Sequence, residues 1–292
     1  MKKIIAIFIS IILVISGIPT LVFAVEADKP TRYSVLVLDV CGEAQFLDKY
    51  DNVIYTADSA INYVKESAKT FLADLIKANG DNYVDVVTYS DYAQVITDFT
   101  NDINKVTTLV DSLSSNSNVR NLSDGLNKAD SLLSSIPDNA TKNVILVTTG
   151  MVNAGDYSYS GIYNDSVVGS SWRRTDTQVR LYAYANSAYN CTTKIKERAN
   201  LYVLGLFQTM EGMPDEGKDI ARFFRTSAKD FASSDETFYE IENPSDIGFF
   251  FGEISDDIID TNISANVYNH INFIMKLWLK KYFWFSFSTY FS

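Results

Sequence analysis

The chain of 292 residues is short of histidine and cysteine, with one and two residues respectively, and these shortages exclude several kinds of enzyme. The histidine, His270, lies near the C-terminus, so the body of the chain has no imidazole for a Ser-His-Asp or Cys-His relay or for a zinc site. Its glycines are scattered and form no phosphate-binding loop. We therefore expect no enzyme; a hydrolase or redox enzyme using Cys41 as nucleophile remains an alternative that lacks a base.

Positive charge is also scarce. The net charge is −11, and it becomes −16 for residues 25–264 once the two lysines before this segment and the three lysines after it are set aside. So acidic a body repels phosphate backbones, which excludes a nucleic-acid-binding protein. The charge suits a domain that binds cations or basic partners.

The N-terminus has the pattern of a targeting signal. Lys2 and Lys3 precede an apolar stretch from Ile4 to Phe23, and small residues near Ala24 provide a cleavage site. We expect a signal peptide over residues 1–24, a linker over 25–32, and an exported protein that is extracellular or on the cell surface. The alternative is an uncleaved anchor, because the apolar stretch is just long enough to span a bilayer.

The C-terminal tail, residues 261–292, differs sharply in composition from the segment before it. From Val267 onward it is aromatic and basic, and three lysines interrupt the apolar residues. One interpretation is a membrane-interface segment over residues 271–292, with aromatic rings at headgroup depth. The other is the product of a truncation or frameshift in a longer chain.

Between these ends, residues 33–260 alternate apolar strands with helical stripes. This alternation predicts an α/β domain, a doubly wound and mostly parallel sheet with one antiparallel edge strand. We expect a polar loop from residue 41 to about 58, a helix from about residue 61 capped by Asp58 or Ser59, and a short helix at Ile220–Thr226. The expected strands are Tyr33–Asp39, Tyr83–Tyr89, Gln94–Asp98, Asn143–Thr148, Leu201–Phe207 and Thr237–Ile241.

The predicted topology places Asp39 at the carboxyl end of a parallel strand, where ligands bind in such sheets. The loops 41–58, 114–120 and 151–176 lie at the same edge. Cys41 follows this strand end, whereas Cys191 falls far along a helix that runs away from it. We therefore expect two free thiols instead of a disulfide.

Five segments carry a resemblance to a known family: VLVLDVCGE, VDVVTYSDYAQVITDFT, VRNLSDGLNKA, KNVILVTTG and NLYVLGLF. In this order and at this spacing, the chain from about Tyr33 to Ile259 resembles a von Willebrand factor type A domain. The resemblance implies a six-stranded doubly wound sheet and a function in adhesion or scaffolding. The implied partner is a protein or a cell-envelope component.

Most such domains hold Mg²⁺ or Mn²⁺ through Asp-x-Ser-x-Ser, a Thr in a later loop and a further Asp. In this sequence Asp39 is kept, but Cys41 and Glu43 stand where the two serines are expected. Arg120 stands in place of the Thr and Thr149 in place of the last Asp. A thiol is a poor ligand for a hard cation and an arginine repels one, so the resemblance implies a degenerate metal site and no cofactor.

Two arrangements could replace the metal at this relic adhesion site. In the first, the guanidinium of Arg120 pairs with Asp39, Glu43 or both; the bland alternative is an Arg120 that points to solvent. In the second, Asp39 and Glu43 hold Mg²⁺ or Mn²⁺ weakly, and the domain is a cation-dependent adhesion domain.

The loop 151–176 is a candidate surface for a partner. It is rich in Tyr, Ser, Gly and Asn, a composition that is typical of recognition loops. Tyr159, Trp172, Arg173 and Arg174 are the expected anchors. The alternative is a variable surface insertion that has no partner.

Overall fold

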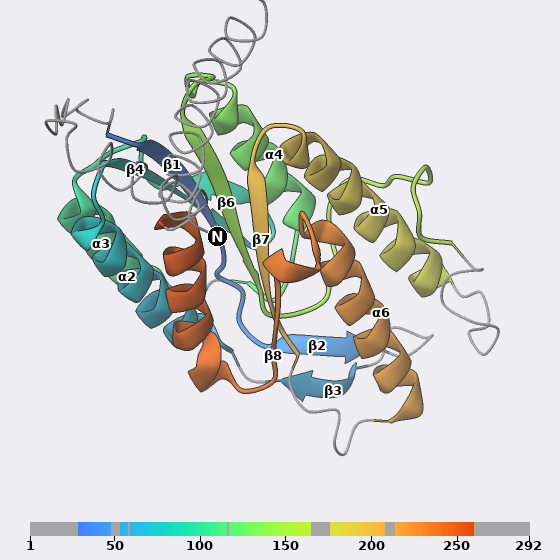
Figure 1. Cartoon of the computed structure of the whole chain (residues 1–292). Coiled ribbons are helices and arrows are strands. Elements are labelled where there is room, and N and C mark those ends of the chain that lie inside the picture. The colour runs from blue at the N-terminus through green and yellow to red at the C-terminus, as the bar shows by residue number, and fades with distance from the viewer. Residues whose placement is uncertain are drawn as a thin grey trace, which may run out of the picture.

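The computed structural model describes residues 29–47, 53–57, 59–115, 117–164, 176–207 and 214–259. Their centre is a six-stranded sheet in the order β5-β4-β1-β6-β7-β8 (Figure 1). Strand β5 runs antiparallel to β4, and the other neighbouring pairs are parallel. This confirms the predicted fold class. The strands are β1 (Thr31–Asp39), β4 (Asp81–Tyr89), β5 (Ala93–Val95), β6 (Thr141–Thr148), β7 (Asn200–Leu206) and β8 (Phe238–Ile241).

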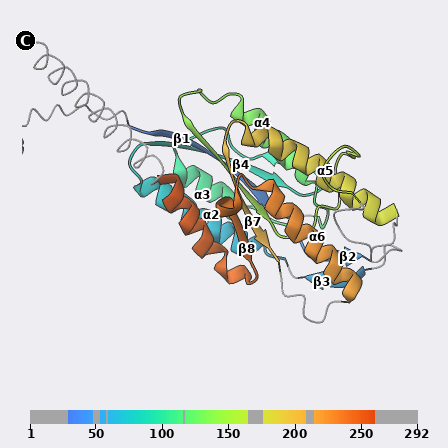
Figure 2. The same cartoon turned by 45° about the vertical axis from the view of Figure 1, so that its right-hand side comes forward.

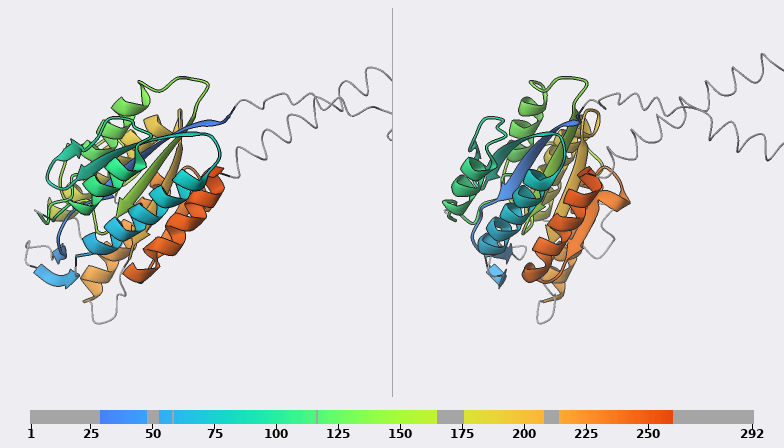
Figure 3. Two further views of the ribbon diagram at one scale, coloured as in Figure 1. Left: turned by 90° about the vertical axis from the view of Figure 1, so that its left-hand side faces the viewer. Right: turned by 60° about the vertical axis from the view of Figure 1, so that its left-hand side comes forward.

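Helices cover both faces of the sheet, as Figures 2 and 3 show. The central strands β1, β6 and β7 are buried along almost their whole length, because each face lies under a layer of helices. One layer consists of α2 (Ile61–Lys77), α3 (Ile103–Asp111) and a helix at residues 247–259. The other consists of α4 (Leu122–Leu133), α5 (Asp176–Lys196) and α6 (Asp215–Phe231).

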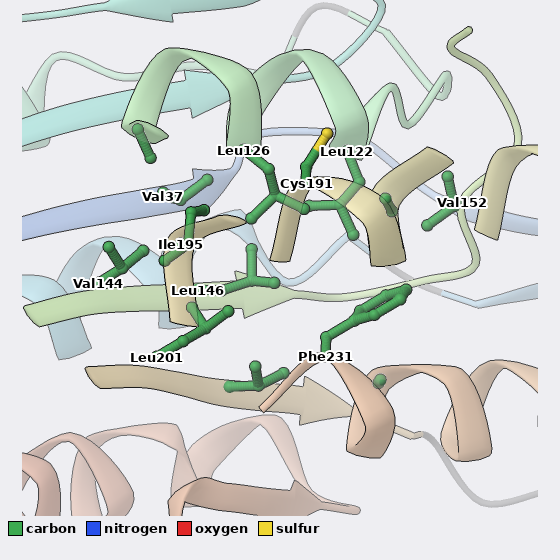
Figure 4. Packing of buried hydrophobic residues seen from close by; sticks show 14 of the residues in the cluster. Val37, Leu122, Leu126, Val144, Leu146, Val152, Cys191, Ile195, Leu201 and Phe231 are labelled. Carbon is green, nitrogen blue, oxygen red and sulfur yellow. The ribbon is translucent and has the colours of Figure 1, made fainter. Parts of the chain in front are cut away.

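The core under α4, α5 and α6 shows how the alternating strands and the helical stripes fit together (Figure 4). Val37 and Leu146 project from the sheet, and they belong to the same buried cluster as Leu126 of α4 and Ile195 of α5. Each of these side chains is at most 1% exposed. Burial of an aliphatic side chain contributes about 1.5–3 kcal/mol, so this layer stabilises the domain strongly.

Two predictions about local structure were wrong. The segment expected to be a polar loop contains a β-hairpin, β2 (Ala44–Leu47) and β3 (Val53–Ala57), which Figure 1 places beside α6 at the end of β1. Its strands are short, and their period-two pattern is too brief to stand out from a loop. Helix α6 was expected to cover seven residues but has 17. Its N-terminal turns are polar and carry no apolar stripe, so the sequence pattern did not reveal them.

The ends of α4 and α2 show how these helices begin and stop, and they correct the one predicted cap. The side chain of Asn121 accepts a hydrogen bond from the amide of Asp124 at 3.2 Å and so caps α4. Gly80, with φ of 118°, follows α2 in the left-handed region that glycine favours. The N-cap of α2, however, is Ala60 and not the expected Asp58 or Ser59; the Ser59 hydroxyl accepts from the amide of Ile61 at 3.5 Å.

Cys41 and Cys191 are buried free thiols, as predicted. The expected signal peptide, the first half of the linker and the C-terminal tail lie outside the described residues. Within the ranges that are described, no helix has both the length and the apolar character needed to cross a membrane.

Candidate functional site

The candidate site lies at the carboxyl edge of the sheet, where three separate segments meet. Asp39 ends β1, Thr149 follows β6, and Arg120 lies just before α4. The Nε atom of Arg120 donates to Oδ2 of Asp39 at 3.1 Å, and the two side chains are 2% and 0% exposed. The structure thus brings together residues that are 81 positions apart in the sequence and seals their ion pair from solvent.

The Asp39 carboxylate has hydrogen-bond partners on both oxygens. Its Oδ2 accepts from the amide and from the hydroxyl of Thr149, each at 2.9 Å, in addition to the arginine. Its Oδ1 accepts from the amide of Cys41 at 2.9 Å. A buried carboxylate held by one cation and three further donors keeps its charge without solvent.

The guanidinium of Arg120 uses each of its five N–H donors. Besides the bond to Asp39, one terminal nitrogen donates to the main-chain oxygens of Glu43 and Asn118, at 3.3 and 3.5 Å. The other donates to the main-chain oxygen of Gly42 at 3.1 Å and to the hydroxyl of Thr149 at 3.3 Å. Arg120 therefore joins the end of β1, the loop before α4 and the residue after β6.

The charges of this pair support each other. Burial by itself would raise the pKa of Asp39, but the charge of Arg120 and the hydrogen bonds from Thr149 and Cys41 outweigh it, and the pKa is lower than usual. Burial by itself would lower the pKa of Arg120, but the nearby Asp39 carboxylate keeps it raised. Both groups are therefore ionised over the whole physiological range.

Cys41 stays a protonated thiol in this environment. Its pKa is raised well beyond the usual value, first by burial and then by the negative charge of Asp39. Its sulfur contacts the main-chain oxygens of Val119 at 3.2 Å and Tyr89 at 3.8 Å, as a weak donor would. These contacts suit a small buried side chain, and the raised pKa is the opposite of what a nucleophile needs.

Glu43 differs from Asp39 in exposure and in its contact with Arg120, although both acids were expected at the site. Residue 43 is exposed, and its main-chain oxygen, not its carboxylate, is the atom that accepts from Arg120. A hard divalent cation prefers several oxygen ligands, whereas the side chains gathered here are a carboxylate, a hydroxyl, a thiol and a guanidinium. This set does not fit such an ion, and no cluster of three or more acidic, histidine or cysteine side chains occurs among the described residues.

Two asparagines hold Arg120 in place, and sequence analysis did not select either of them. The side-chain oxygen of Asn153 accepts from the amide of Arg120 at 2.7 Å. The Asn153 amide group donates to the main-chain oxygen of Asn118 at 3.2 Å, and that oxygen also accepts from Arg120. No spacing pattern marks these residues, because their role depends on two loops that meet only in the folded chain.

The loop that begins after β6 is fixed along α5 over its described part, residues 151–164. The Asn186 side chain forms two hydrogen bonds with the main chain of Tyr163, at 2.9 and 3.0 Å. The Tyr163 ring is buried, and its hydroxyl donates to Asp230 at 3.1 Å. The Asn190 side chain donates to the Ser158 hydroxyl and to the main-chain oxygen of Ser160.

This fixed loop presents tyrosines to solvent. Tyr159 is 79% exposed and Tyr157 is 51% exposed. Their rings are nearly parallel with centroids 6.3 Å apart, and Tyr157 also stacks on Tyr184 of α5 at 4.9 Å. Of the anchors expected from the sequence, Tyr159 is thus at the surface, whereas Trp172, Arg173 and Arg174 lie outside the described residues.

Comparisons with known proteins agree with this fold. A family model described as von Willebrand factor type A domain matches residues 55–152. A solved vWF domain of the type V pili tip protein Mfa5 from Porphyromonas gingivalis is similar at a TM-score of 0.57 and 14% identity, covering 81% of this chain and 96% of that one. No curated protein matches the sequence.

Two further solved structures are similar. The pilus adhesin SpaC from Lactobacillus rhamnosus GG has a TM-score of 0.57 and 13% identity, covering 80% of this chain and 30% of its own. The minor pilin PilB from Streptococcus sanguinis has a TM-score of 0.54 and 18% identity, covering 78% of this chain and 61% of its own. The chain thus spans less than two thirds of these two proteins. The family model thus matches part of the described domain, and the solved structures share its fold.

Proposed function

We propose that this protein is an exported, cell-surface adhesion or scaffold protein whose type A domain binds its partner without a metal ion and catalyses no reaction. The observation that carries the proposal is the position of the Arg120 guanidinium, bonded to Asp39 at the carboxyl edge of the sheet. A cation that used Asp39 as a ligand would have to displace a buried arginine and leave its charge unpaired, which costs several kcal/mol.

Export and a surface location are supported by two independent features. The N-terminal sequence has the pattern of a signal peptide. Domains of similar fold occur in a pili tip protein, a pilus adhesin and a minor pilin. In this proposal the acidic body faces an extracellular partner, a protein or a component of the cell envelope.

The arginine also changes how a partner can be held. A metal ion with an open position would accept a carboxylate of the partner, but Arg120 is 2% exposed and its N–H groups already have acceptors. A partner's carboxylate therefore finds neither an open ligand position nor a free donor there. Recognition depends instead on the exposed groups around the site, above all the tyrosines of the loop at residues 151–164.

The test measures adhesion directly. Beads that carry the full-length chain are passed over surfaces coated with peptidoglycan, mucin or collagen, with and without EDTA. We expect retention on at least one surface, unchanged by the chelator. Retention that EDTA abolishes and Mg²⁺ restores would contradict the metal-free mechanism and support the weak cation site at Asp39 and Glu43. Absence of retention on every surface would contradict an adhesive function.

The same assay tests the loop. Replacing Tyr159 together with Trp172 by alanine should reduce retention at least tenfold without unfolding the domain, because rigid aromatic side chains dominate such interfaces. Tyr63→Ala is the matched control, since Tyr63 is 46% exposed on α2. Equal retention by the double variant and the control would exclude the loop as the binding surface.

A further inference from the structure

A small cavity lies at the carboxyl end of β4, next to the Arg120 site but separate from it. Its volume is about 190 Å³, room for roughly six water molecules at ~30 Å³ each. The end of β4, strand β5 and the end of α3 form its wall, and we call it the β4–α3 pocket. Its lining residues are Val40, Thr88, Ser90, Tyr92, Gln94, Ile96, Ser112, Leu113 and Ser114.

The lining combines two kinds of surface and carries no formal charge. Val40, Ile96 and Leu113 provide apolar contacts, while hydroxyl and amide groups provide hydrogen bonds. An ionised ligand would lose its hydration in this pocket without gaining a counter-charge. The pocket therefore favours a neutral ligand that has both C–H surface and several polar groups.

The polar side chains of the lining differ in exposure and in the hydrogen bonds that they already make. Thr88 is 5% exposed, and over the described parts of the chain its hydroxyl has no hydrogen bond, while its oxygen is not sealed within the protein. Gln94 and Ser114 are exposed at the mouth of the pocket. The hydroxyls of Ser90 and Ser112 already donate to Asp91 and to the main-chain oxygen of Leu109, so they meet a ligand as acceptors. Because the Thr88 oxygen is reached from the pocket and has no partner within the described residues, it can donate to and accept from a bound ligand.

An aromatic ring stands at the rim of the pocket on a fixed turn. Tyr92 is 51% exposed, and its amide donates to the Asp91 carboxylate at 3.2 Å. The next amide, that of Ala93, donates to Asp124 at 2.7 Å, and the main-chain oxygen of Asp91 accepts from Asn121 at 3.3 Å. A rim that is already ordered loses little entropy when a ligand binds.

We propose that the β4–α3 pocket binds one neutral sugar ring, the terminal pyranose of a glycan; this deepens the proposed adhesive function and rests on it. A pyranose has C–H faces that stack on an aromatic ring, here Tyr92, and a rim of hydroxyls that match Thr88, Gln94 and the serines. A peptide side chain offers fewer polar groups than a pyranose and brings a main chain that needs partners of its own.

Saturation-transfer NMR with the full-length chain tests the proposal. The probes are the methyl glycosides of glucose, galactose, mannose, N-acetylglucosamine and N-acetylgalactosamine at millimolar concentration. We expect saturation transfer to at least one of them, and a titration of that glycoside should weaken at least tenfold in Thr88→Val and at least fivefold in Tyr92→Ala. Valine has the shape of threonine and suits a strand, so Thr88→Val retains the fold.

Matched variants control for indirect effects. Thr193→Val removes an exposed hydroxyl from α5 on the opposite face of the sheet, and Tyr63→Ala removes an exposed ring from α2. Both should bind like the wild type. The proposal is wrong if no glycoside shows saturation transfer, or if the binding of a glycoside is the same in Thr88→Val, Tyr92→Ala and their controls.

A neutral peptide is the alternative occupant, and N-acetyl-asparagine amide is its probe. Binding of this amide in a Thr88-dependent manner, with no glycoside binding, would replace the sugar by a peptide. If only the sugar inference fails, the beads should still be retained on a surface free of glycans, and EDTA should not release them. It would be lost on every surface if the adhesive function itself fails.

Discussion

Two buried acids in neighbouring strands of the same sheet meet opposite environments. Asp39, at the end of β1, has Arg120 and the donors of Thr149 and Cys41 around it. Asp85, within β4, is 0% exposed, and neither of its carboxylate oxygens has a hydrogen-bond partner among the described residues.

Their pKa values differ accordingly. The pKa of Asp39 is lower than usual despite burial, whereas burial, with a smaller contribution from the charge of Asp98, raises the pKa of Asp85 to about 7. Burial therefore does not decide the charge of an acid; the donors that meet it do. The carboxyl edge of the sheet therefore stabilises an ionised carboxylate, whereas the middle of β4 favours a protonated one.

Removing the arginine should produce the largest effect. Arg120→Met leaves Asp39 buried without its cation, and we expect a loss of about 3–5 kcal/mol in the free energy of unfolding. The control is Arg198→Met, because Arg198 forms a partly exposed pair with Asp130, and such pairs contribute about 0–1 kcal/mol. Urea denaturation measures both. Equal losses in the two variants would mean that Arg120 does not stabilise Asp39.

Asp85, unlike Asp39, should make the folded protein less stable as the pH rises. Because its folded pKa is raised, the folded state binds its proton more tightly than the unfolded state. Its destabilising effect is therefore absent below the unfolded pKa of ~3.9 and grows as the pH rises toward 7.

Asp85→Asn tests this effect. The variant should be more stable than the wild type by about 4 kcal/mol at pH 8 and close to it at pH 4, because asparagine has no proton to lose. Thermal or urea unfolding across this range gives the comparison, and Asp81→Asn, at the exposed start of β4, is the control. A wild type that is more stable than Asp85→Asn at pH 8 would contradict this explanation.

The smallest expected effect concerns Thr149. Thr149→Val removes the hydroxyl that donates to Asp39 and accepts from Arg120, and we expect a loss of about 1–2 kcal/mol. Thr108→Val, which removes an exposed hydroxyl from α3, should stay within about 0.5 kcal/mol of the wild type. A loss as small as the control's would show that the amide of Thr149 and the arginine suffice for Asp39.

The sequence predicted the larger elements because their patterns are long. Strands such as Asn143–Thr148 and the stripe of α4 carry enough apolar residues to identify both their type and their burial. The hairpin β2–β3 and the first turns of α6 were missed because few of their residues form a pattern. Their structure depends on packing against other elements, which a single sequence does not display.

The candidate site was predictable only in part. The strand end at Asp39 and the substitutions at Arg120 and Thr149 could be located from the sequence. The contacts through the main chains of Gly42, Asn118 and Glu43 could not be located, since every residue has a carbonyl oxygen and residue type does not reveal which ones bond Arg120. For the same reason nothing pointed to Asn153 or to the β4–α3 pocket, which exist only once β4, β5 and α3 are assembled.

The most direct test of the central claim is a calorimetric titration with Mn²⁺. The wild type is compared with Cys41→Ser/Glu43→Ser/Arg120→Thr/Thr149→Asp, which restores the oxygen ligands of the metal-binding pattern around Asp39. We expect no binding by the wild type and binding of one ion by the variant, because the arginine is replaced by ligands that a hard cation prefers. Stoichiometric Mn²⁺ binding by the wild type that is lost in Asp39→Ala would contradict the account.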